Sequence, residues 1–434
     1  MRTRITNFII SSGSNIFIQG GFLLTASNFI TGFMNYLFNL LVARSLGPEG
    51  FGEITAMFSY MVILSIPIGI LNTLLIQKIG SADDKVNYVL SIQAWLVLKL
   101  KKWWLILVFI LATTPFIPKM TNLTQATGYA LPLLIVFSII GAFYSGAMQG
   151  MHMFLWFSIL GFVGTLIKLM GPMLVYLGLG DISMVIIFLI ISSSFPIYFF
   201  YLLFKNKIKN IDGNVKIINK RVLSIFRDKQ LWFTAGATGV LALMNNVDII
   251  VVKKMFSAEE AGIYSSWALV AKIIFYVCGP LLSMSYIFFA SKKDEVKHQA
   301  IFIGLFILFF IVGVVTYLGF PYFGRTIVYI LFGNKYLSVI PYLTLASYFG
   351  TGYLIMVFMT YYFLAKKSKA CLLPTIIFPA YILALIFYPK TISDVMHLDG
   401  IFVFVNVAVF LVIFFKDRFL YLFRLSSAKS AIRE

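Results

Sequence analysis

Charged side chains are scarce in this chain of 434 residues, where Asp, Glu, Lys and Arg together make up 12%. A soluble domain carries about 25% of these residues, so the scarcity excludes an ordinary soluble protein. Hydrophobic residues make up 60% of the chain. They gather in runs of about 20 residues, the length at which a helix crosses a bilayer. The composition therefore predicts an all-α polytopic membrane protein rather than a β-barrel.

Cysteine and histidine are also rare. Cys278 and Cys371 fall in or at the ends of apolar stretches, which excludes a disulfide framework. His152, His298 and His397 are too scattered for a metal cluster. The phosphate-binding runs GxxxxGKS and GxxxxGKT are missing, so nucleotide-driven pumping by this chain is not expected. We expect neither a cofactor nor a metal ion.

Basic residues outnumber acidic ones by 35 to 16, and their placement defines a topology. We predict twelve spans, near residues 16–44, 52–77, 103–118, 127–148, 152–177, 183–204, 230–252, 262–289, 299–319, 337–364, 370–388 and 400–415. The termini and the even-numbered connections then hold 26 of the 35 Lys and Arg residues. By the positive-inside rule both termini are predicted to be cytoplasmic. The surplus charge thus predicts contact with lipid headgroups rather than with nucleic acid.

A basic cytoplasmic linker, residues 205–229, divides the predicted spans equally. We expect an N-terminal lobe at 1–204, a C-terminal lobe at 230–415 and a basic cytoplasmic tail at 416–434. A shift of 210 residues aligns Asn35 with Asn245 and Gly69 with Gly279, which indicates an internal duplication. Six spans per lobe give both lobes the same orientation. The lobes should therefore be related by a pseudo-twofold axis along the membrane normal, with a site between them.

The segment KLKKWW, Lys99–Trp104, has basic and indole groups that resemble an interfacial anchor. Residues 86–98 would then form a helix along the cytoplasmic surface. The alternative is a third span that starts near residue 88 and turns its lysines toward an aqueous cavity.

Three ionisable side chains, Lys168, Asp248 and Lys272, are predicted near the middle of the membrane. A charge buried there costs roughly 2.5–3.5 kcal/mol on insertion scales, so we expect these groups to have a function. Asp248 and Lys272 could neutralise each other on adjacent spans. Lys168 would still lack an acidic partner in the membrane. A phosphate of a substrate, or a water-filled lumen, would satisfy it.

Polar residues form stripes on three of the predicted spans. Asn28, Asn35 and Asn39 share one face of the first span, because they are spaced by seven and four residues. Asn245 and Asp248 lie on the seventh span, and Lys272 and Tyr276 lie on the eighth. Such stripes either join neighbouring helices or line a cavity. For the three asparagines we favour a cavity wall.

Three segments carry a resemblance to a known family: LVARSLGPEGFGE (Leu41–Glu53), GAMQGMHMF (Gly146–Phe154) and ILFGNKYLSVIPYL (Ile330–Leu343). Together they resemble the Wzx-type polysaccharide flippases of the multidrug/oligosaccharidyl-lipid/polysaccharide exporter superfamily. The resemblance implies two six-helix lobes around a central cationic cavity.

The cargo implied by this resemblance is a polyprenyl-diphosphate-linked oligosaccharide, turned from the inner to the outer leaflet by alternating access. The candidate substrate-binding residues are Lys168, Lys272, Arg44, Asn28, Asn35, Asn39, Asn245 and Tyr276. Asp248 is a candidate coupling group or charge pair. Polysaccharide polymerases are conceivable partners, and the internal pseudosymmetry suggests that a monomer can work alone.

Three alternatives remain beside a lipid-linked oligosaccharide flippase. A cation-coupled multidrug antiporter of the same superfamily would use Asp248, and a flippase for the peptidoglycan precursor lipid would differ only in its cargo. A polymerase or glycosyltransferase would need acids, bases or metal ligands in a sizeable outer loop. The longest outer loop expected here, 320–336, holds Arg325 and Lys335 but no carboxylate. We therefore expect a transporter rather than an enzyme.

Overall fold

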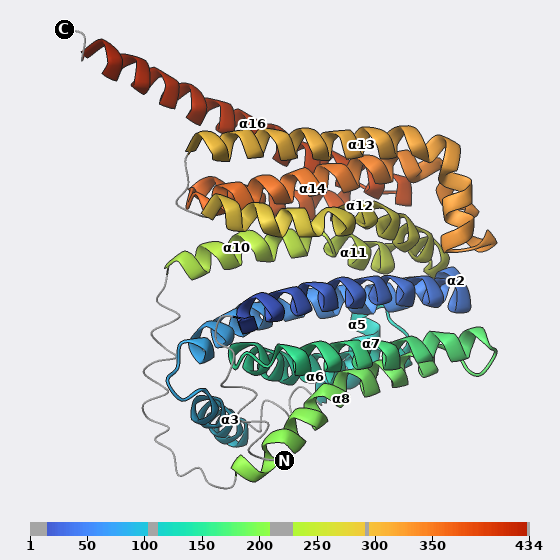
Figure 1. Ribbon diagram of the computed structural model, residues 1–434. Helices are drawn as coiled ribbons and strands as arrows, with labels where there is room; N and C mark the ends of the chain where they lie inside the picture. Colours follow the sequence, from blue (N-terminus) through green and yellow to red (C-terminus); the bar gives the residue numbers. More distant parts are fainter. Residues whose placement is uncertain (1–14, 103–111, 209–228, 291–294, 432–434) are drawn as a thin grey trace. The chain divides into compact units, whose positions relative to one another are not determined.

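The structure is a computed structural model that describes residues 15–102, 112–208, 229–290 and 295–431. These residues form helices joined by short connections (Figure 1), which confirms the expected all-α fold. The chain divides into two compact units, Met1–Asp228 and Lys229–Glu434. Most of the linker predicted at 205–229 lies outside the described residues, which stop at 208 and resume at 229.

The first unit is built from long helices and two short ones. They are α2 (Asn15–Gly80), α3 (Lys85–Lys102), η1 (Thr114–Phe116), α5 (Ile117–Thr121), α6 (Gln125–Gly150), α7 (Phe154–Tyr176) and α8 (Ile182–Ile208). Helix α2 contains both the first and the second predicted span. Between them the chain kinks at Gly47, whose φ of 71° lies in the left-handed region, and Pro48 follows. Glycine adopts this conformation without strain, so the kink lies where the sequence permits it.

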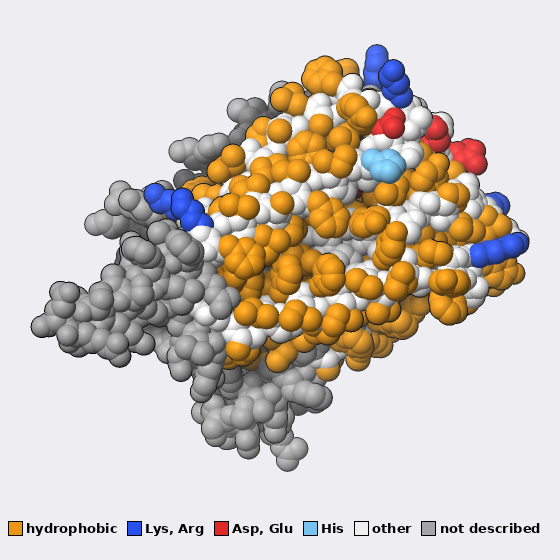
Figure 2. Space-filling view, turned by 90° about the horizontal axis from the view of Figure 1, so that it is seen from above, with side chains coloured by type: hydrophobic (Ala, Val, Ile, Leu, Met, Phe, Trp, Pro, Cys, Tyr) orange, Lys and Arg blue, Asp and Glu red, His pale blue; other side chains and the backbone are white. Residues whose placement is uncertain are grey.

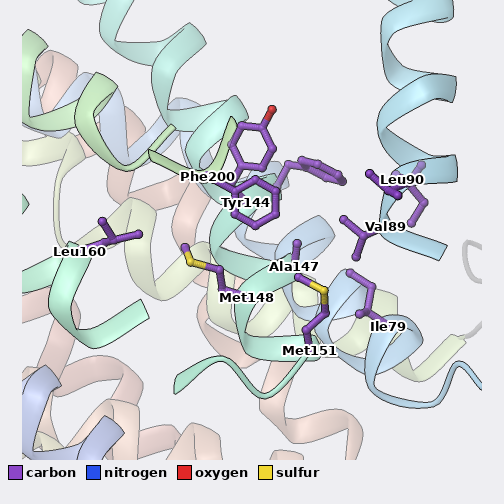
Figure 3. Close-up of a cluster of buried hydrophobic side chains, with 11 residues drawn as sticks. Ile79, Val89, Leu90, Tyr144, Ala147, Met148, Met151, Leu160 and Phe200 are labelled. Atoms are coloured by element: carbon purple, nitrogen blue, oxygen red, sulfur yellow. The ribbon is translucent and has the colours of Figure 1, made fainter. Parts of the chain in front are cut away.

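Helix α3 lies across one end of the first unit. Figure 1 shows it nearly end-on, whereas α2, α6 and α7 run across the view. Its buried Val89 and Leu90 pack near Ile79 of α2 and Met151 beyond α6 (Figure 3). This arrangement suits the surface helix expected at 86–98. Trp103 and Trp104 of the predicted anchor, and most of the third span predicted at 103–118, fall on residues 103–111, outside the described ranges.

The second unit also consists of helices. They are α10 (Lys229–Met244), α11 (Val247–Met255), α12 (Ala258–Ala290), α13 (Glu295–Leu331), η2 (Asn334–Tyr342), α14 (Leu343–Ala365), η3 (Lys369–Leu372), α15 (Leu373–Phe387) and α16 (Ile392–Ala431). Helices α10 and α11 together form the seventh predicted span, interrupted at Asn245 and Asn246.

Helix α14 forms the core of the second unit, where it packs against α12, α13 and α16. In its most apolar stretch 83% of the residues are buried, against 44% or less in the other candidate spans. The contact with α12 is close because Gly350 has no side chain. A β carbon at Gly350 would lie 2.3 Å from the carbonyl oxygen of Ala271. A glycine thus sets the distance between two helices.

Ten helices among the described residues are long and apolar enough to cross a membrane. One of them, residues 26–80 of α2, is 55 residues long and covers two predicted spans. Each remaining predicted span except the third coincides with a described helix or with two helices separated by a break. Figure 2 shows one face largely covered by apolar side chains, with the charged ones near its margins. A surface of this kind suits hydrocarbon as its solvent.

Two predicted boundaries were wrong in the second unit. The twelfth span was expected to begin near residue 400, but α16 begins at Ile392, which brings Asp399 into the helix. The outer loop expected at 320–336 is largely helical, because α13 continues to Leu331 and η2 begins at Asn334. Polar residues near a span end shorten the apolar run without ending the helix, since a helix needs only its backbone hydrogen bonds to continue.

Candidate functional site

Lys168 lies in α7, where this helix packs against α2. It is eight residues from the end of α7, or about 12 Å along the helix axis. Its Nζ donates a hydrogen bond to Oδ1 of Asn35 over 2.9 Å. The same atom lies 4.2 Å from the ring centroid of Phe38 and 4.7 Å from that of Phe58. Two residues before the kink of α2 and one after it therefore surround a single ammonium group.

This arrangement stabilises the ammonium without neutralising it. An amide oxygen and two ring faces are the contacts of Lys168 Nζ in the described part of the chain, and no carboxylate is among them. A cation over an aromatic ring gains about 0.5–2 kcal/mol, depending on how far it is desolvated. The side chain remains partly exposed. Lys168 is therefore a positive charge that an anion can still approach.

The other candidates on α2 have different surroundings. Asn28 is exposed, while the Asn39 side chain donates to the Asn35 carbonyl over 3.1 Å. The Asn35 side chain in turn donates to the carbonyl of Thr31, which orients its oxygen toward Lys168. Arg44 is exposed near the kink, nine residues beyond Asn35. The asparagine stripe thus includes one member that holds the lysine and one that faces outward.

Asp248 belongs to a buried polar cluster in the second unit. Tyr264 Oη on α12 lies 2.7 Å from Oδ2 of Asp248 on α11 and 2.5 Å from Oδ2 of Asp399 on α16. Tyr381 Oη on α15 donates to Oδ1 of Asp399 over 2.6 Å. The side chains of these four residues are at most 1% exposed. The cluster joins four helices through groups that would be costly to bury without partners.

Lys272 is close to this cluster but does not pair directly with Asp248. Its Nζ donates to the main-chain carbonyl of Asn245 over 2.6 Å. Asn245 lies at the break between α10 and α11, where the helical hydrogen-bond pattern is interrupted. The lysine therefore satisfies a carbonyl freed by the break. It is 7% exposed, so in this structure it is part of the interior of the second unit.

Tyr276 is one helical turn beyond Lys272 on α12, but it points elsewhere. Its side chain is 54% exposed and lies edge-on to Phe275. Within each unit the structure joins one pair of the predicted residues. Lys168 and Asn35 contact each other in the first unit, and Lys272 and Asn245 contact each other in the second.

Sequence reasoning missed Asp399, Tyr264 and Tyr381. The twelfth span was predicted to begin near residue 400, which left Asp399 just outside it. A usable signal was the carboxylate itself, since HLDGIFVFVN continues into an uninterrupted apolar helix. The two tyrosines carried no comparable signal in a chain with 23 tyrosines.

Glu53, the last residue of the segment Leu41–Glu53, is also buried, at 3% exposure. Its Oε1 accepts a hydrogen bond from the backbone N of Thr124 over 2.5 Å, and another from Oγ1 of Thr127. Thr124 is the N-cap residue of α6. A carboxylate at a helix N-terminus satisfies free N–H groups and complements the helix dipole. Glu53 therefore fastens α2 to the start of α6.

Replacing Glu53 by alanine is expected to lower the free energy of unfolding by about 1–3 kcal/mol, because two donors lose their acceptor. The measurement is thermal unfolding of the purified protein in detergent. Glu49→Ala is the matched control, because Glu49 is four residues earlier in the same helix and exposed. Equal midpoints for both variants would show that Glu53 does not hold α6.

Solved structures share this fold at low sequence identity. A multidrug resistance MATE family transporter of the MOP superfamily, in an inward-facing conformation, superposes with a TM-score of 0.66 at 11% identity, covering 93% of this chain and 96% of that one. The lipid II flippase MurJ, in an inward closed conformation, gives 0.65 at 16% identity, covering 90% and 87%. No curated protein sequence matches the chain significantly.

The fold is thus shared with this MATE family transporter and with MurJ, in agreement with the resemblance of the three sequence segments. The family model described as polysaccharide biosynthesis protein matches residues 17–287, more than half of the chain. The chain belongs to this polysaccharide biosynthesis protein family.

Proposed function

We propose that the protein is a flippase that moves a polyprenyl-diphosphate-linked oligosaccharide from the inner to the outer leaflet. The observation that carries the proposal is the ammonium of Lys168, which Asn35, Phe38 and Phe58 hold in the first unit, with no carboxylate of the described residues among its contacts. Membership of a polysaccharide biosynthesis family supports a glycan cargo. The similarity to a lipid II flippase supports a lipid-linked one.

The chemistry of a diphosphate suits this lysine. A phosphate oxygen accepts charge-assisted hydrogen bonds, which are about twice as strong as neutral ones. One N–H of the Lys168 ammonium donates to Asn35, so its remaining N–H groups can turn toward an anion. Moving two negative charges out of a cell with a negative interior is favourable by roughly 2.3 kcal/mol per charge for each 100 mV. Export could therefore be driven by the membrane potential.

Within this proposal the two units are the lobes of an alternating-access transporter in a prokaryotic plasma membrane. Both termini are cytoplasmic, and one chain works as a monomer beside its polymerase partners. Lys168 binds the diphosphate, while Asn28, Arg44 and Tyr276, which are exposed, contact the glycan or its headgroup. Lys272 and Asn245 instead keep the break in the seventh span in place.

The test is flux of a fluorescent polyprenyl-diphosphate oligosaccharide in proteoliposomes with an imposed potential. The labelled lipid should become accessible on the opposite leaflet faster than in protein-free vesicles. An inside-negative potential should accelerate its outward movement. A lipid of the same chain length that carries a neutral glycoside in place of the diphosphate is the matched cargo control. Equal rates with and without the protein, for several glycans, would reject the flippase.

A cation-coupled antiporter is the second candidate, because Asp248 and Asp399 form a buried carboxyl pair in the second unit. Such a protein would move a cationic dye in exchange for protons or sodium ions, driven by the gradient of that ion. Dye transport that is lost in Asp399→Asn, together with no movement of the lipid-linked glycan, would favour this candidate.

A further inference from the structure

Two basic side chains meet at the end of the first unit where α2 ends and α7 begins. Nζ of Lys85, the first residue of α3, lies 3.5 Å from Nε2 of His152, in the connection between α6 and α7. This distance exceeds the length of about 2.7–3.2 Å that is usual for a hydrogen bond from an N–H group. The two groups are therefore neighbours that do not hold each other strongly.

The surrounding structure fixes the backbone of both residues. Met151 precedes His152, Val89 lies one helical turn after Lys85, and both belong to the buried cluster of Figure 3. The ring of His152 stacks on that of Phe154, with 5.6 Å between the ring centroids. His152 is nonetheless exposed, and Lys85 is half-buried. The pair is thus held in place and remains open to a ligand.

The contacts of this pair within the described part of the chain include no carboxylate. Asp84, which precedes α3, directs its carboxylate to Asn87, whose backbone N and Nδ2 donate to it over 3.0 and 2.6 Å. The pKa of His152 is lowered, first by partial burial of the ring and then by the charge of Lys85. Asp83 and Lys78 nearby are exposed to solvent. An anion at the pair would separate two basic groups that otherwise disfavour each other's charge.

Apolar residues beside the pair point to a lipid as the source of this anion. Leu155 and Trp156, in the first turn of α7, are 50% and 37% exposed. Exposed indole and aliphatic side chains at the end of a membrane helix lie at the border between hydrocarbon and headgroups. Lipid headgroups carry their phosphates at this depth. A phosphate can therefore reach the pair while the lipid chains stay beside α7.

The second unit contains a similar pair, with lysine and histidine exchanged. Nζ of Lys366 lies 3.2 Å from Nδ1 of His298. His298 follows Lys85 by 213 residues, and Lys366 follows His152 by 214, close to the shift that aligns the two halves. His298 is only 2% exposed, and its ring lies edge-on to that of Phe288. The pair of the second unit is thus enclosed by protein, whereas the imidazole of His152 is accessible.

We propose that Lys85 and His152 together bind the phosphate group of a lipid headgroup. The ammonium and the protonated imidazole each donate a hydrogen bond to a phosphate oxygen. Lys168 lies 14 residues along α7 from its first residue, or about 21 Å along the helix axis. The lipid site is therefore separate from the site proposed for the cargo, and it does not depend on the proposed function.

Protection of histidine from chemical modification tests the proposal on the full-length protein in dodecyl maltoside, a detergent without phosphate. Diethyl pyrocarbonate reacts with neutral imidazole, and mass spectrometry of peptides distinguishes the three histidines of the chain. Dioctanoyl phosphatidylglycerol should slow the modification of His152 about three- to tenfold, because a bound anion covers the ring and favours its protonated form. The exposed His397 should react at an unchanged rate, which excludes a general effect of micelle charge.

The matched variants are Lys85→Gln, which should abolish the protection of His152, and Lys119→Gln, which removes an exposed lysine from α5 and should retain it. Dioctanoylglycerol has the same chains without phosphate and should not protect. Farnesyl diphosphate and inorganic phosphate distinguish the sources of the anion. Protection by farnesyl diphosphate and not by phosphatidylglycerol would assign the site to a prenyl diphosphate, and protection by inorganic phosphate alone would overturn a lipid site.

Thermal unfolding separates this site from a contact that only holds α3. A ligand that binds the folded protein raises its unfolding temperature, so phosphatidylglycerol should stabilise the wild type and not Lys85→Gln. A purely structural contact predicts a lower unfolding temperature for Lys85→Gln without lipid, and no protection of His152 by any phosphate. The proposal fails on that result, on equal protection by dioctanoylglycerol, or on protection that persists in Lys85→Gln. No transport is measured, so this outcome is independent of the flippase assay.

Discussion

Lys168→Met lowers the flux of the diphosphate-linked oligosaccharide about 10- to 100-fold, if Lys168 binds the diphosphate as proposed. A hydrogen bond to a charged group contributes about 1.5–3 kcal/mol, and each 1.4 kcal/mol is a factor of ten. Lys168→Arg keeps the charge and should retain part of the flux. Lys119→Met, which removes an exposed lysine from α5 of the same unit, is the control and should transport normally. Wild-type flux in Lys168→Met would show that Lys168 does not bind the diphosphate.

Asn35→Asp separates binding of cargo from support of the fold. The new carboxylate would lie where Asn35 Oδ1 now accepts from Lys168 Nζ, at 2.9 Å. The resulting ion pair should raise the unfolding temperature, or leave it unchanged, and it should lower flux by occupying the ammonium. If Lys168 served only to hold α7 against α2, the variant would be stable and fully active. Measuring both properties on one preparation distinguishes these outcomes.

Gly350→Ala has the largest expected effect on stability. The added β carbon would lie 2.3 Å from the Ala271 carbonyl oxygen and 3.0 Å from Cδ1 of Ile274, so α12 and α14 would have to separate. Overpacking of this kind costs about 1–3 kcal/mol, and more where backbone atoms must move. Because Ala271 precedes Lys272, the shift would also disturb the contact of Lys272 with Asn245. The expected result is a lower thermal midpoint in detergent, or no folded protein.

Gly279→Ala is the matched control for this prediction. Gly279 lies on α12 as well, and a β carbon there would meet no atom within 4 Å. Alanine is favoured over glycine inside a helix by about 0.5–1 kcal/mol, so this variant should be as stable as the wild type or slightly more stable. Equal losses in both variants would mean that the spacing of α12 and α14 is not set by Gly350.

The polar residues show how far sequence reasoning could go. Helical spacing predicts that Asn28 and Asn35 share a face, but Lys168 is 133 residues from Asn35, and no local pattern joins these two residues. The pairing expected between Asp248 and Lys272 was reasonable from charge alone. In the structure Asp248 contacts a phenol, and the lysine bonds a carbonyl that only a broken helix leaves free. Neither the break at Asn245 nor the contact of the Asn245 carbonyl with Lys272 is visible in the hydropathy pattern.

The sequence by itself determined the fold class, because runs of apolar residues are stable in a bilayer only as helices with satisfied backbone groups. It also determined most span positions and the presence of buried charges that need partners. Only the tertiary structure decided which partners those charges have. It enclosed Lys168 between Asn35 and two aromatic rings, and it joined Asp248 to Asp399 through Tyr264. Such contacts depend on how distant helices pack, which a local pattern does not encode.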